Sequence, residues 1–366
     1  MSQHPILGNL TLGMAGLPGE DPKYSGGFPR ERKTQKFFLS QRSRVLKKEK
    51  LSVVFMGTPE FACPSLDKLI EEEKVVAVVT QPDRPAGRGR KIRPSAVKLA
   101  ASERNIPVYQ PENLKDPDFL KKINLLQPDL IVVVAFGRLL PGIMLNIPRI
   151  FSINLHPSLL PKYRGPAPVP WAIIKGESQT GVTVQKMKEK VDEGEIILQR
   201  KISINPEDTC GILNKKLSYL GSQTLIEAIK LIKQGKAKLK PQQGKTSYAP
   251  KITKKMGKIN WRASAWEIHN LVRGLNPAPG AFTTFPREGK SCRIKIWKTA
   301  VLENSPYGEE SQPGTVVKIQ KETGFVVKTG GGALLVKEVQ LPGKPRINAY
   351  DFIKGYRIRE GFLLGG

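Results

Sequence analysis

The chain has 366 residues, of which 39% are hydrophobic and 7% aromatic, and this is typical of a globular protein with two domains. Its 60 Lys and Arg residues outnumber 32 Asp and Glu residues, so the net charge of +28 excludes a charge-balanced surface. The composition also excludes a membrane-spanning segment, because no apolar run reaches roughly 18 residues, and a disulfide framework or zinc site, because the three cysteines are widely spaced.

Residues 1–50 differ in composition from the rest of the chain. They are rich in Gly, Pro, Ser and basic residues and end in the stretch RSRVLKKEK. A basic, acid-poor segment is typical of a transit peptide, and the apolar core of a secretory signal is missing. We expect a disordered extension, a targeting segment or translated sequence upstream of the true start codon. A targeting segment would indicate the mitochondrial matrix or a plastid; otherwise we expect the bacterial cytoplasm.

Residues 51–236 alternate short apolar runs with segments of helical period. The expected strands are 51–57, 75–80, 106–110, 128–136, 150–155, 181–187 and 195–204, and the longest expected helix is 206–235, with Asp208 or Thr209 as N-cap. Continuous apolar strands between helices predict an α/β domain, a Rossmann-like and mostly parallel sheet with helices on both faces. Ligands of such sheets bind at the carboxyl ends of the strands.

Residues 237–255 are polar, basic and proline-containing, so we expect a linker. Beyond it, residues 256–366 begin with a helix at 264–275, opened by a capping box of Ser264 and Glu267. Short strands separated by glycine turns follow at 281–285, 292–298, 314–320, 324–329 and 332–341. This pattern predicts a small C-terminal β-barrel, similar to an OB fold.

The positive charge is concentrated toward this barrel. From Ala237 onward, 23 Lys and Arg residues stand against 9 Asp and Glu. A basic surplus fits either an ordinary solvated surface or a polyanionic partner, and its uneven distribution favours nucleic acid. In the strand CRIKIWK, Arg293, Lys295 and Trp297 share one face, which suits contact with an RNA backbone.

The stretch FSINLHPSLLPKYRGPAPVP, residues 151–170, combines a strand with chemically active side chains. Asn154 and His156 are two residues apart, so they point to the same side of the strand at its carboxyl end. Together they can supply an oxyanion donor and a proton acceptor. A carboxylate is available from Asp192 in KVDEGEII, although Asp-x-Gly is also an ordinary turn sequence.

NLHPSLLPKYRGPAP, followed by GVTVQKM and VDEGEI, closely resembles the folate-dependent formyltransferase family, and the resemblance covers roughly residues 51–366. It implies that Asn154, His156 and Asp192 form the catalytic trio. It also implies that two segments line the site of the folate, SLLP and part of VVVAFGRLLP. Their folate-binding residues would be Ser158, Leu159, Leu160, Pro161, Phe136, Gly137, Leu139 and Leu140.

The loop TQPDRPAGRGRKIRPSAVK (Thr80–Lys98) and the basic C-terminal domain resemble the branch of the family that acts on methionyl initiator tRNA. The implied reaction transfers the formyl group of 10-formyltetrahydrofolate to the amino group of the methionine. No metal is expected. We expect a monomer that does not associate with membranes. A basic loop beside the active site can clamp an acceptor stem through its phosphates. Its implied tRNA contacts are Arg84, Arg88, Arg90, Lys91 and Arg93, beside Arg293 and Lys295 of the barrel.

Other functions are compatible with parts of this pattern. A formyltransferase for a small amine, such as an amino-sugar nucleotide, or a formyltetrahydrofolate hydrolase would use the same trio but would leave the basic loop and barrel unexplained. A non-catalytic RNA-binding protein on the same scaffold would be expected to have lost one of the trio, and all three residues are present.

Overall fold

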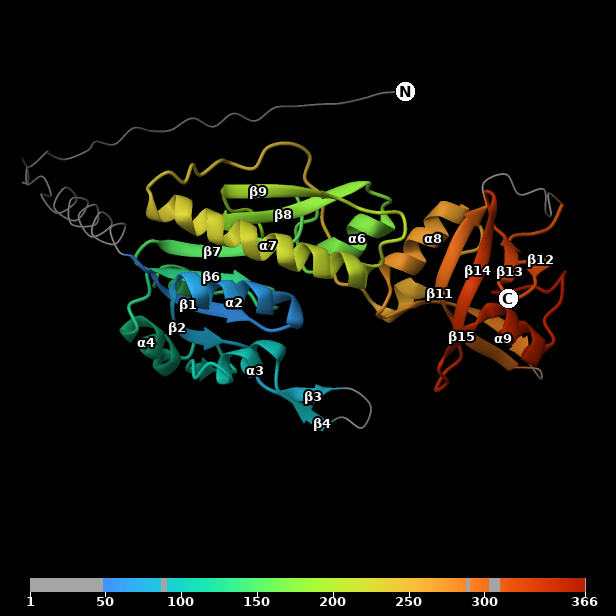
Figure 1. The fold of residues 1–366 in the computed structure, drawn as a ribbon, viewed down its shortest axis with the longest axis horizontal. Helices are drawn as coiled ribbons and strands as arrows, with labels where there is room; N and C mark the ends of the chain where they lie inside the picture. Colours follow the sequence, from blue (N-terminus) through green and yellow to red (C-terminus); the bar gives the residue numbers. More distant parts are fainter. Residues whose placement is uncertain (1–48, 87–90, 288–289, 303–309, 366) are drawn as a thin grey trace, which may run out of the picture. The chain divides into compact units, whose positions relative to one another are not determined.

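The computed structural model describes residues 49–86, 91–287, 290–302 and 310–365 (Figure 1). The chain divides into two units, Met1–Ser40 and Gln41–Gly366, and the described residues belong to the second. The extension predicted at residues 1–50 therefore lies outside the described residues except for Glu49 and Lys50. The division into a catalytic domain, a linker and a barrel domain at the predicted boundaries stays a prediction.

A seven-stranded sheet, in the order β5-β2-β1-β6-β7-β8-β9, forms the first half of this unit. Its parallel strands are β1 (Ser52–Gly57), β2 (Lys74–Val79), β5 (Val108–Tyr109), β6 (Leu130–Val134) and β7 (Phe151–His156). Two antiparallel strands follow, β8 (Gln179–Lys186) and β9 (Ile196–Ser203). The predicted Rossmann-like, mostly parallel sheet is confirmed. The chain winds first to one side of β1 and then to the other, so the switch point, where ligands usually bind, lies between β1 and β6.

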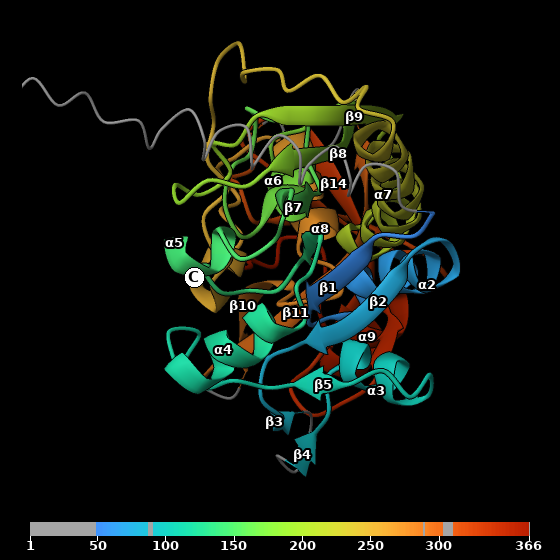
Figure 2. The same cartoon turned by 90° about the vertical axis from the view of Figure 1, so that its left-hand side faces the viewer.

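Helices cover both faces of the sheet, as predicted. They are α2 (Cys63–Glu72), α3 (Ala96–Ser102), α4 (Pro117–Leu125), α5 (Gly142–Leu145), α6 (Pro168–Ile174) and α7 (Cys210–Lys233), with a short 3-10 turn, η1 (Glu60–Ala62), before α2. In Figure 2, α2 and α7 lie to the right of the strands and α4 and α5 to the left. Thr209 is the N-cap of α7, accepting a hydrogen bond from the backbone of Ile212, whereas Asp208 binds Lys216.

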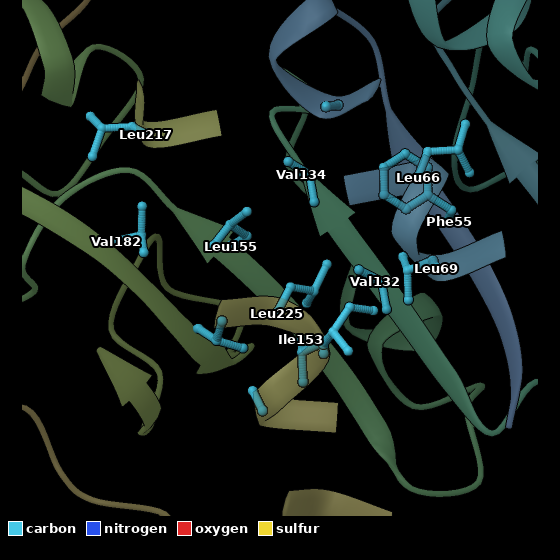
Figure 3. Packing of buried hydrophobic residues seen from close by; sticks show 14 of the residues in the cluster. Phe55, Leu66, Leu69, Val132, Val134, Ile153, Leu155, Val182, Leu217 and Leu225 are labelled. Carbon is cyan, nitrogen blue, oxygen red and sulfur yellow. The ribbon is translucent and has the colours of Figure 1, made fainter. Parts of the chain in front are cut away.

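The strands alternate between two hydrophobic cores. Leu130, Val132 and Val134 of β6 are buried in the core under α2 and α7, whereas Ile131 and Val133 face the core under α4 and α5. Figure 3 shows the first core, with side chains of β1, β6, β7 and β8 meeting those of α2 and α7. This apolar packing fixes the positions of the carboxyl ends of β6 and β7. Site residues lie at or shortly after both of these ends.

The second half contains α8 (Ala265–Gly274), whose capping box of Ser264 and Glu267 is formed as predicted. A six-stranded antiparallel sheet follows, in the order β10-β11-β14-β13-β12 with β15 beside β14. Its strands are β10 (Ala281–Arg287), β11 (Lys290–Leu302), β12 (Val316–Gln320), β13 (Gly324–Lys328), β14 (Ala333–Gln340) and β15 (Arg346–Asn348), and the helix α9 (Ala349–Tyr356) follows β15. Their inner faces share one hydrophobic core, so the prediction of a small barrel-like domain is confirmed.

The segment predicted as a linker is fastened to the α/β domain. Residues 237–253 lead to a 3-10 turn, η2 (Lys254–Gly257), and make isolated bridges between Lys240 and Ile196 and between Tyr248 and Arg164. Ala249 within it is fully buried. No helix among the described residues is both long and apolar enough to cross a membrane.

Candidate active site

The end of β7 presents its polar side chains on one side, as the two-residue spacing predicted. Ile153 and Leu155 are buried in the hydrophobic core, and Asn154 and His156 line a cavity on the other side. His156 is 5% exposed. The structure therefore brings these two predicted residues to one wall.

The His156 ring has two different neighbours. Its Nε2 lies 2.9 Å from the carbonyl oxygen of Tyr163. Because a carbonyl only accepts hydrogen bonds, Nε2 carries the proton in this arrangement. The other nitrogen, Nδ1, lies 3.5 Å from Oδ1 of Asp192. In the neutral ring Nδ1 is thus the nitrogen that can accept a proton, and the carboxylate is placed to stabilise the imidazolium that results.

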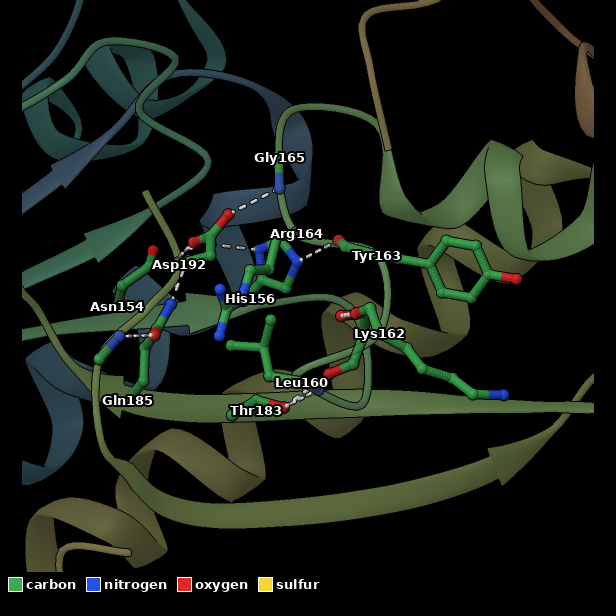
Figure 4. A network of polar contacts seen from close by, with 12 residues as sticks. Asn154, His156, Leu160, Lys162, Tyr163, Arg164, Gly165, Thr183, Gln185 and Asp192 are labelled. Atoms are coloured by element: carbon green, nitrogen blue, oxygen red, sulfur yellow. Dashed lines mark hydrogen bonds and ion pairs between the residues drawn. The ribbon is translucent and has the colours of Figure 1, made fainter. Parts of the chain in front are cut away.

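Asp192 completes the trio from the loop between β8 and β9 (Figure 4). Its Oδ1 accepts hydrogen bonds from Nε2 of Gln185 at 3.0 Å and from Nδ2 of Asn154 at 3.4 Å. Its Oδ2 accepts from the backbone N–H of Gly165 at 2.8 Å. Donors from β7, β8 and the loop after β7 thus fix the position of the carboxylate.

The residue itself has a left-handed backbone. The φ angle of Asp192 is +53°, a region that few residues other than glycine adopt. Gly194, two residues on, has no room for a side chain, because a Cβ there would lie 1.7 Å from the carbonyl oxygen of Lys186. Gln185 was not identified from the sequence. Its pairing with Asn154 across β7 and β8 is what places it beside Asp192.

The trio lines a cavity of about 610 Å³. The loop after β6 supplies another wall, and four of the predicted folate-binding residues lie there, namely Phe136, Gly137, Leu139 and Leu140. Phe136 and Leu140 are buried, and Leu139 is 71% exposed, so it offers an apolar surface to a bound molecule. A cavity of this size with apolar walls and a few convergent polar groups is typical of a small-molecule site.

The other four predicted folate-binding residues, Ser158, Leu159, Leu160 and Pro161, are not among the residues that line the cavity. Ser158 and Leu160 are buried in the protein. The hydroxyl of Thr183 donates to the carbonyl of Ser158 at 2.6 Å and accepts from the N–H of Leu160 at 3.2 Å. Gln199 donates to the same hydroxyl and to the carbonyl of Leu160. In this structure residues 158–161 are held by Thr183 and Gln199 and support the end of the strand that carries His156. Their predicted contact with folate stays a prediction.

The basic loop of residues 80–98 forms a hairpin, which the sequence did not predict. Its strands are β3 (Arg84–Ala86) and β4 (Lys91–Arg93), and Arg84 lies opposite Arg93. Both side chains are exposed. Like charges that face each other across two strands repel, and an anion bound between them would relieve that repulsion. Arg88 and Arg90 lie outside the described residues.

The base of the hairpin is fixed by Asp83. Its carboxylate accepts hydrogen bonds from Lys98 at 2.6 Å and from Gln110 at 2.7 Å. The hydrogen bond from Lys98, followed by that from Gln110, lowers the pKa of Asp83. The described strands of the hairpin are thus anchored at the carboxyl end of β2.

In the barrel, Arg293 and Lys295 lie against aromatic rings and Trp297 is covered, and the predicted contact of both cations with tRNA stays a prediction. The Arg293 guanidinium lies 4.2 Å from the centre of the Phe282 ring. Lys295 and Arg346 both lie over the ring of Trp297, which is only 5% exposed. Burial, and then the neighbouring Arg293, Arg346 and Lys254, lowers the pKa of Lys295. The face therefore presents clustered positive charge, without an open aromatic surface.

Within the described ranges, no three His, Cys, Asp or Glu side chains gather as a metal site.

Two family models match the chain. "Formyl transferase" matches residues 49–229 and "Formyl transferase, C-terminal domain" matches residues 251–357. A methionyl-tRNA formyltransferase of Clostridioides difficile is 45% identical over 86% of this chain and 100% of its own length. One of Pelotomaculum thermopropionicum is 48% identical over 86% of this chain and 99% of its own length.

Solved structures share the fold. HypX from Aquifex aeolicus, crystallised in complex with tetrahydrofolic acid, superposes with a TM-score of 0.56 at 18% identity. The match covers 84% of this chain and 48% of HypX, so the chain spans about half the length of that protein. At this identity the likeness is one of fold alone.

The hydrogen bonds of Thr183 give a test of how the residues after His156 are held. Thr183→Val removes a buried hydroxyl with three hydrogen-bond partners, and leaving such partners unsatisfied lowers the free energy of unfolding by about 1–3 kcal/mol. Thr183→Ser keeps the hydroxyl and loses one methyl group. We expect valine to be the more destabilising replacement in chemical denaturation, although its shape is closer to that of threonine. Equal or greater destabilisation by serine would contradict this account.

Proposed function

The chain belongs to the formyl transferase family, and on that premise we propose that it transfers a formyl group from 10-formyltetrahydrofolate to the amino group of methionyl initiator tRNA. The observation that carries the proposal is the meeting of Asn154, His156 and Asp192 on the wall of one cavity. Relatives named methionyl-tRNA formyltransferase match along both domains, which supports this acceptor over smaller amines. The family supports a folate-type formyl donor.

Each residue of the trio has a separate role in the proposed reaction. When the neutral amine attacks the formyl carbon, negative charge develops on the formyl oxygen. The Nδ2 amide of Asn154 donates a hydrogen bond to that oxygen, and stabilising developing charge is usually the largest catalytic contribution. His156 accepts the proton that the amine loses, at Nδ1, and returns one to the departing nitrogen of the donor. The ionised Asp192 stabilises the imidazolium between these two transfers.

The cavity suits the donor through its apolar walls. Phe136, Leu140 and Met187 supply apolar surface around the polar trio, and a fused-ring molecule with polar edges has complementary surfaces. Thr58 and Gln81 donate hydrogen bonds to the carbonyl of Phe136 and hold this wall in place. The donor would thus be positioned by the loop after β6.

Two basic surfaces support a tRNA acceptor. The hairpin of β3 and β4 exposes Arg84 and Arg93 beside each other, and the barrel clusters Arg293, Lys295 and Arg346. Clustered cations on both parts bind phosphates by releasing counterions. An amino-sugar formyltransferase, a formyltetrahydrofolate hydrolase and a non-catalytic RNA-binding protein are the alternatives that the assay below separates.

We propose that the protein acts in the bacterial cytoplasm. The relatives described above come from bacteria, which favours the bacterial cytoplasm over the mitochondrial matrix or a plastid. We propose a monomer.

The activity is tested with purified protein, 10-formyltetrahydrofolate and methionyl initiator tRNA. We expect formylmethionyl-tRNA to form with the charged initiator tRNA, and much more slowly with methionyl elongator tRNA. Uncharged tRNA should give no product because it has no amine acceptor. Release of formate without transfer would favour the hydrolase, and transfer only to an amino-sugar nucleotide would favour the small-amine enzyme. Either result would overturn the proposed function.

The roles within the trio predict a loss of turnover with little loss of binding. His156→Ala and Asp192→Ala should each lower kcat by about 10²- to 10⁴-fold, because each removes a group that moves or stabilises the transferred proton. Asp192→Asn, which removes only the charge, should fall in the same range. The affinity for tRNA and the circular dichroism spectrum should stay close to those of the unchanged protein. A near-normal kcat in either alanine variant would remove that residue from the mechanism.

The hairpin predicts a salt-dependent contribution to tRNA binding. Arg84→Ala and Arg93→Ala should raise the KM for tRNA more than that for the folate, and Arg88→Ala should do the same. Each should also lower the slope of log KM against log salt concentration by about one, since one phosphate contact is lost. Lys121→Ala, an exposed cation on α4, removes the same charge elsewhere and should change neither. If the folate KM rises instead, the hairpin serves the other substrate.

A further inference from the structure

Residues 237–253, which we call the strap, bind both loops that carry the candidate catalytic groups. In Figure 1 this segment leaves the end of α7 and runs back above β9. At one point Lys240 exchanges two backbone hydrogen bonds with Ile196, at the start of β9. Farther along, Ser247 and Ala249 bind the backbone of Arg164. The strap therefore spans from the loop of Asp192 to the loop that follows β7.

The second of these attachments bears directly on His156. The N–H of Tyr163 donates to the hydroxyl of Ser247 at 2.9 Å, and the carbonyl of the same Tyr163 meets Nε2 of His156. The N–H of Ala167 donates to the carbonyl of Ala249. The strap thus fixes the peptide that orients the imidazole.

One side chain of the strap reaches the Asp192 loop. The Nε2 of Gln242 donates to the carbonyl of Asp192 at 2.7 Å and to the carbonyl of Gly194 at 2.8 Å. Its Oε1 accepts from Nε and Nη2 of Arg164, at 3.1 and 2.7 Å. Arg164 also donates to Glu193, at 3.0 Å. The amide of Gln242 therefore joins the loop of Asp192 to the loop beside His156.

The Asp192 loop needs such an outside partner. Its central residue has a φ of +53°, a conformation that costs free energy in a residue with a side chain and persists only when its surroundings enforce it. The two carbonyl groups that Gln242 binds flank Glu193, so they fix the peptides on both sides of the turn. An amide supplies two donated hydrogens and one acceptor oxygen, and a carboxylate of the same size cannot donate.

We propose that Gln242 is a positioning residue for Asp192: it holds the carboxylate at its distance from His156 by fixing the loop backbone and Arg164 together. This inference rests on the proposed function only in assigning Asp192 to catalysis. Gln242 touches no reacting atom and acts through the carboxylate.

The test compares two adjacent glutamines. Gln242→Ala should lower kcat on the order of 10- to 100-fold, the size of effect that a misplacement of about 1 Å produces, with KM values for both substrates within about threefold. Gln242→Glu should be as damaging, because it keeps the size but loses both donated hydrogens. Gln243→Ala is the matched control, since Gln243 is the next residue and is exposed; it should be indistinguishable from the unchanged protein.

A double-mutant cycle separates positioning from a general effect on folding. If Gln242 acts through the carboxylate, Gln242→Ala should lower the single-turnover rate little further in an Asp192→Ala background, because no carboxylate remains to be positioned. A loss of the same size in both backgrounds would overturn the inference. So would a kcat for Gln242→Ala equal to that of Gln243→Ala.

A readout independent of the reaction keeps this inference distinct from the proposed function. Amide hydrogen exchange should increase in residues 187–195 of Gln242→Ala, while β7 keeps the protection of the unchanged protein and Gln243→Ala shows no change. Unchanged exchange in that loop would overturn the proposal even in an active enzyme. Increased exchange in a protein that transfers no formyl group would support the positioning role and refute the proposed function alone.

Discussion

The arrangement of the site depends on one requirement, that a mostly buried carboxylate be satisfied by hydrogen-bond donors. The Asp192 side chain is only 11% exposed, and its two oxygens receive donors from Gln185, Asn154 and Gly165. Leaving a buried charge without such donors would cost more than most single interactions contribute. The end of β7, the antiparallel β8 and the loop after His156 must therefore all lie where they do for one side chain to be tolerated.

The antiparallel end of the sheet determines how the carboxylate reaches this place. Lys186, at the end of β8, lies opposite Ile153 of β7, so the turn between β8 and β9 leaves the sheet beside the amino half of β7. The loop then brings the Asp192 carboxylate back to Asn154 and His156. Because β8 and β9 are antiparallel, a short loop joins them without a crossover helix.

Much of the fold was predictable from local patterns in the sequence. Apolar runs predicted the strands, and the spacing of Ser264 and Glu267 predicted a cap that the structure contains. Asn154 and His156 could be paired because two residues of one strand always share a face. Helices α3, α4, α5, α6 and α9 were not predicted individually. All are short, and the start signals of α4 and α9, Asp116 and Asn348, resemble ordinary turn residues.

Other parts of the site depend on contacts between distant residues. The proximity of Asp192 to His156 could be predicted only from the family resemblance, because it follows from the register of β7 on β8. Gln242 gave no signal, since a polar residue between prolines and lysines is typical of a solvated linker. Trp297 was placed on the correct face of its strand, but the cations that cover it come partly from Arg346, 49 positions away. Neither the composition of the sequence nor its hydrophobic periodicity indicates such contacts between distant residues.

The strap changes where this protein can be divided. Chains built from two domains are usually treated as modules joined by a replaceable tether, and composition alone would put the tether at residues 237–255. A fragment ending at residue 236 would keep the sheet and all three members of the trio, yet it would lack Gln242, Ser247 and Ala249. The α/β module together with the strap that it binds extends to about residue 253. A barrel borrowed from another protein would have to be joined after that point, so that the recipient keeps its own strap.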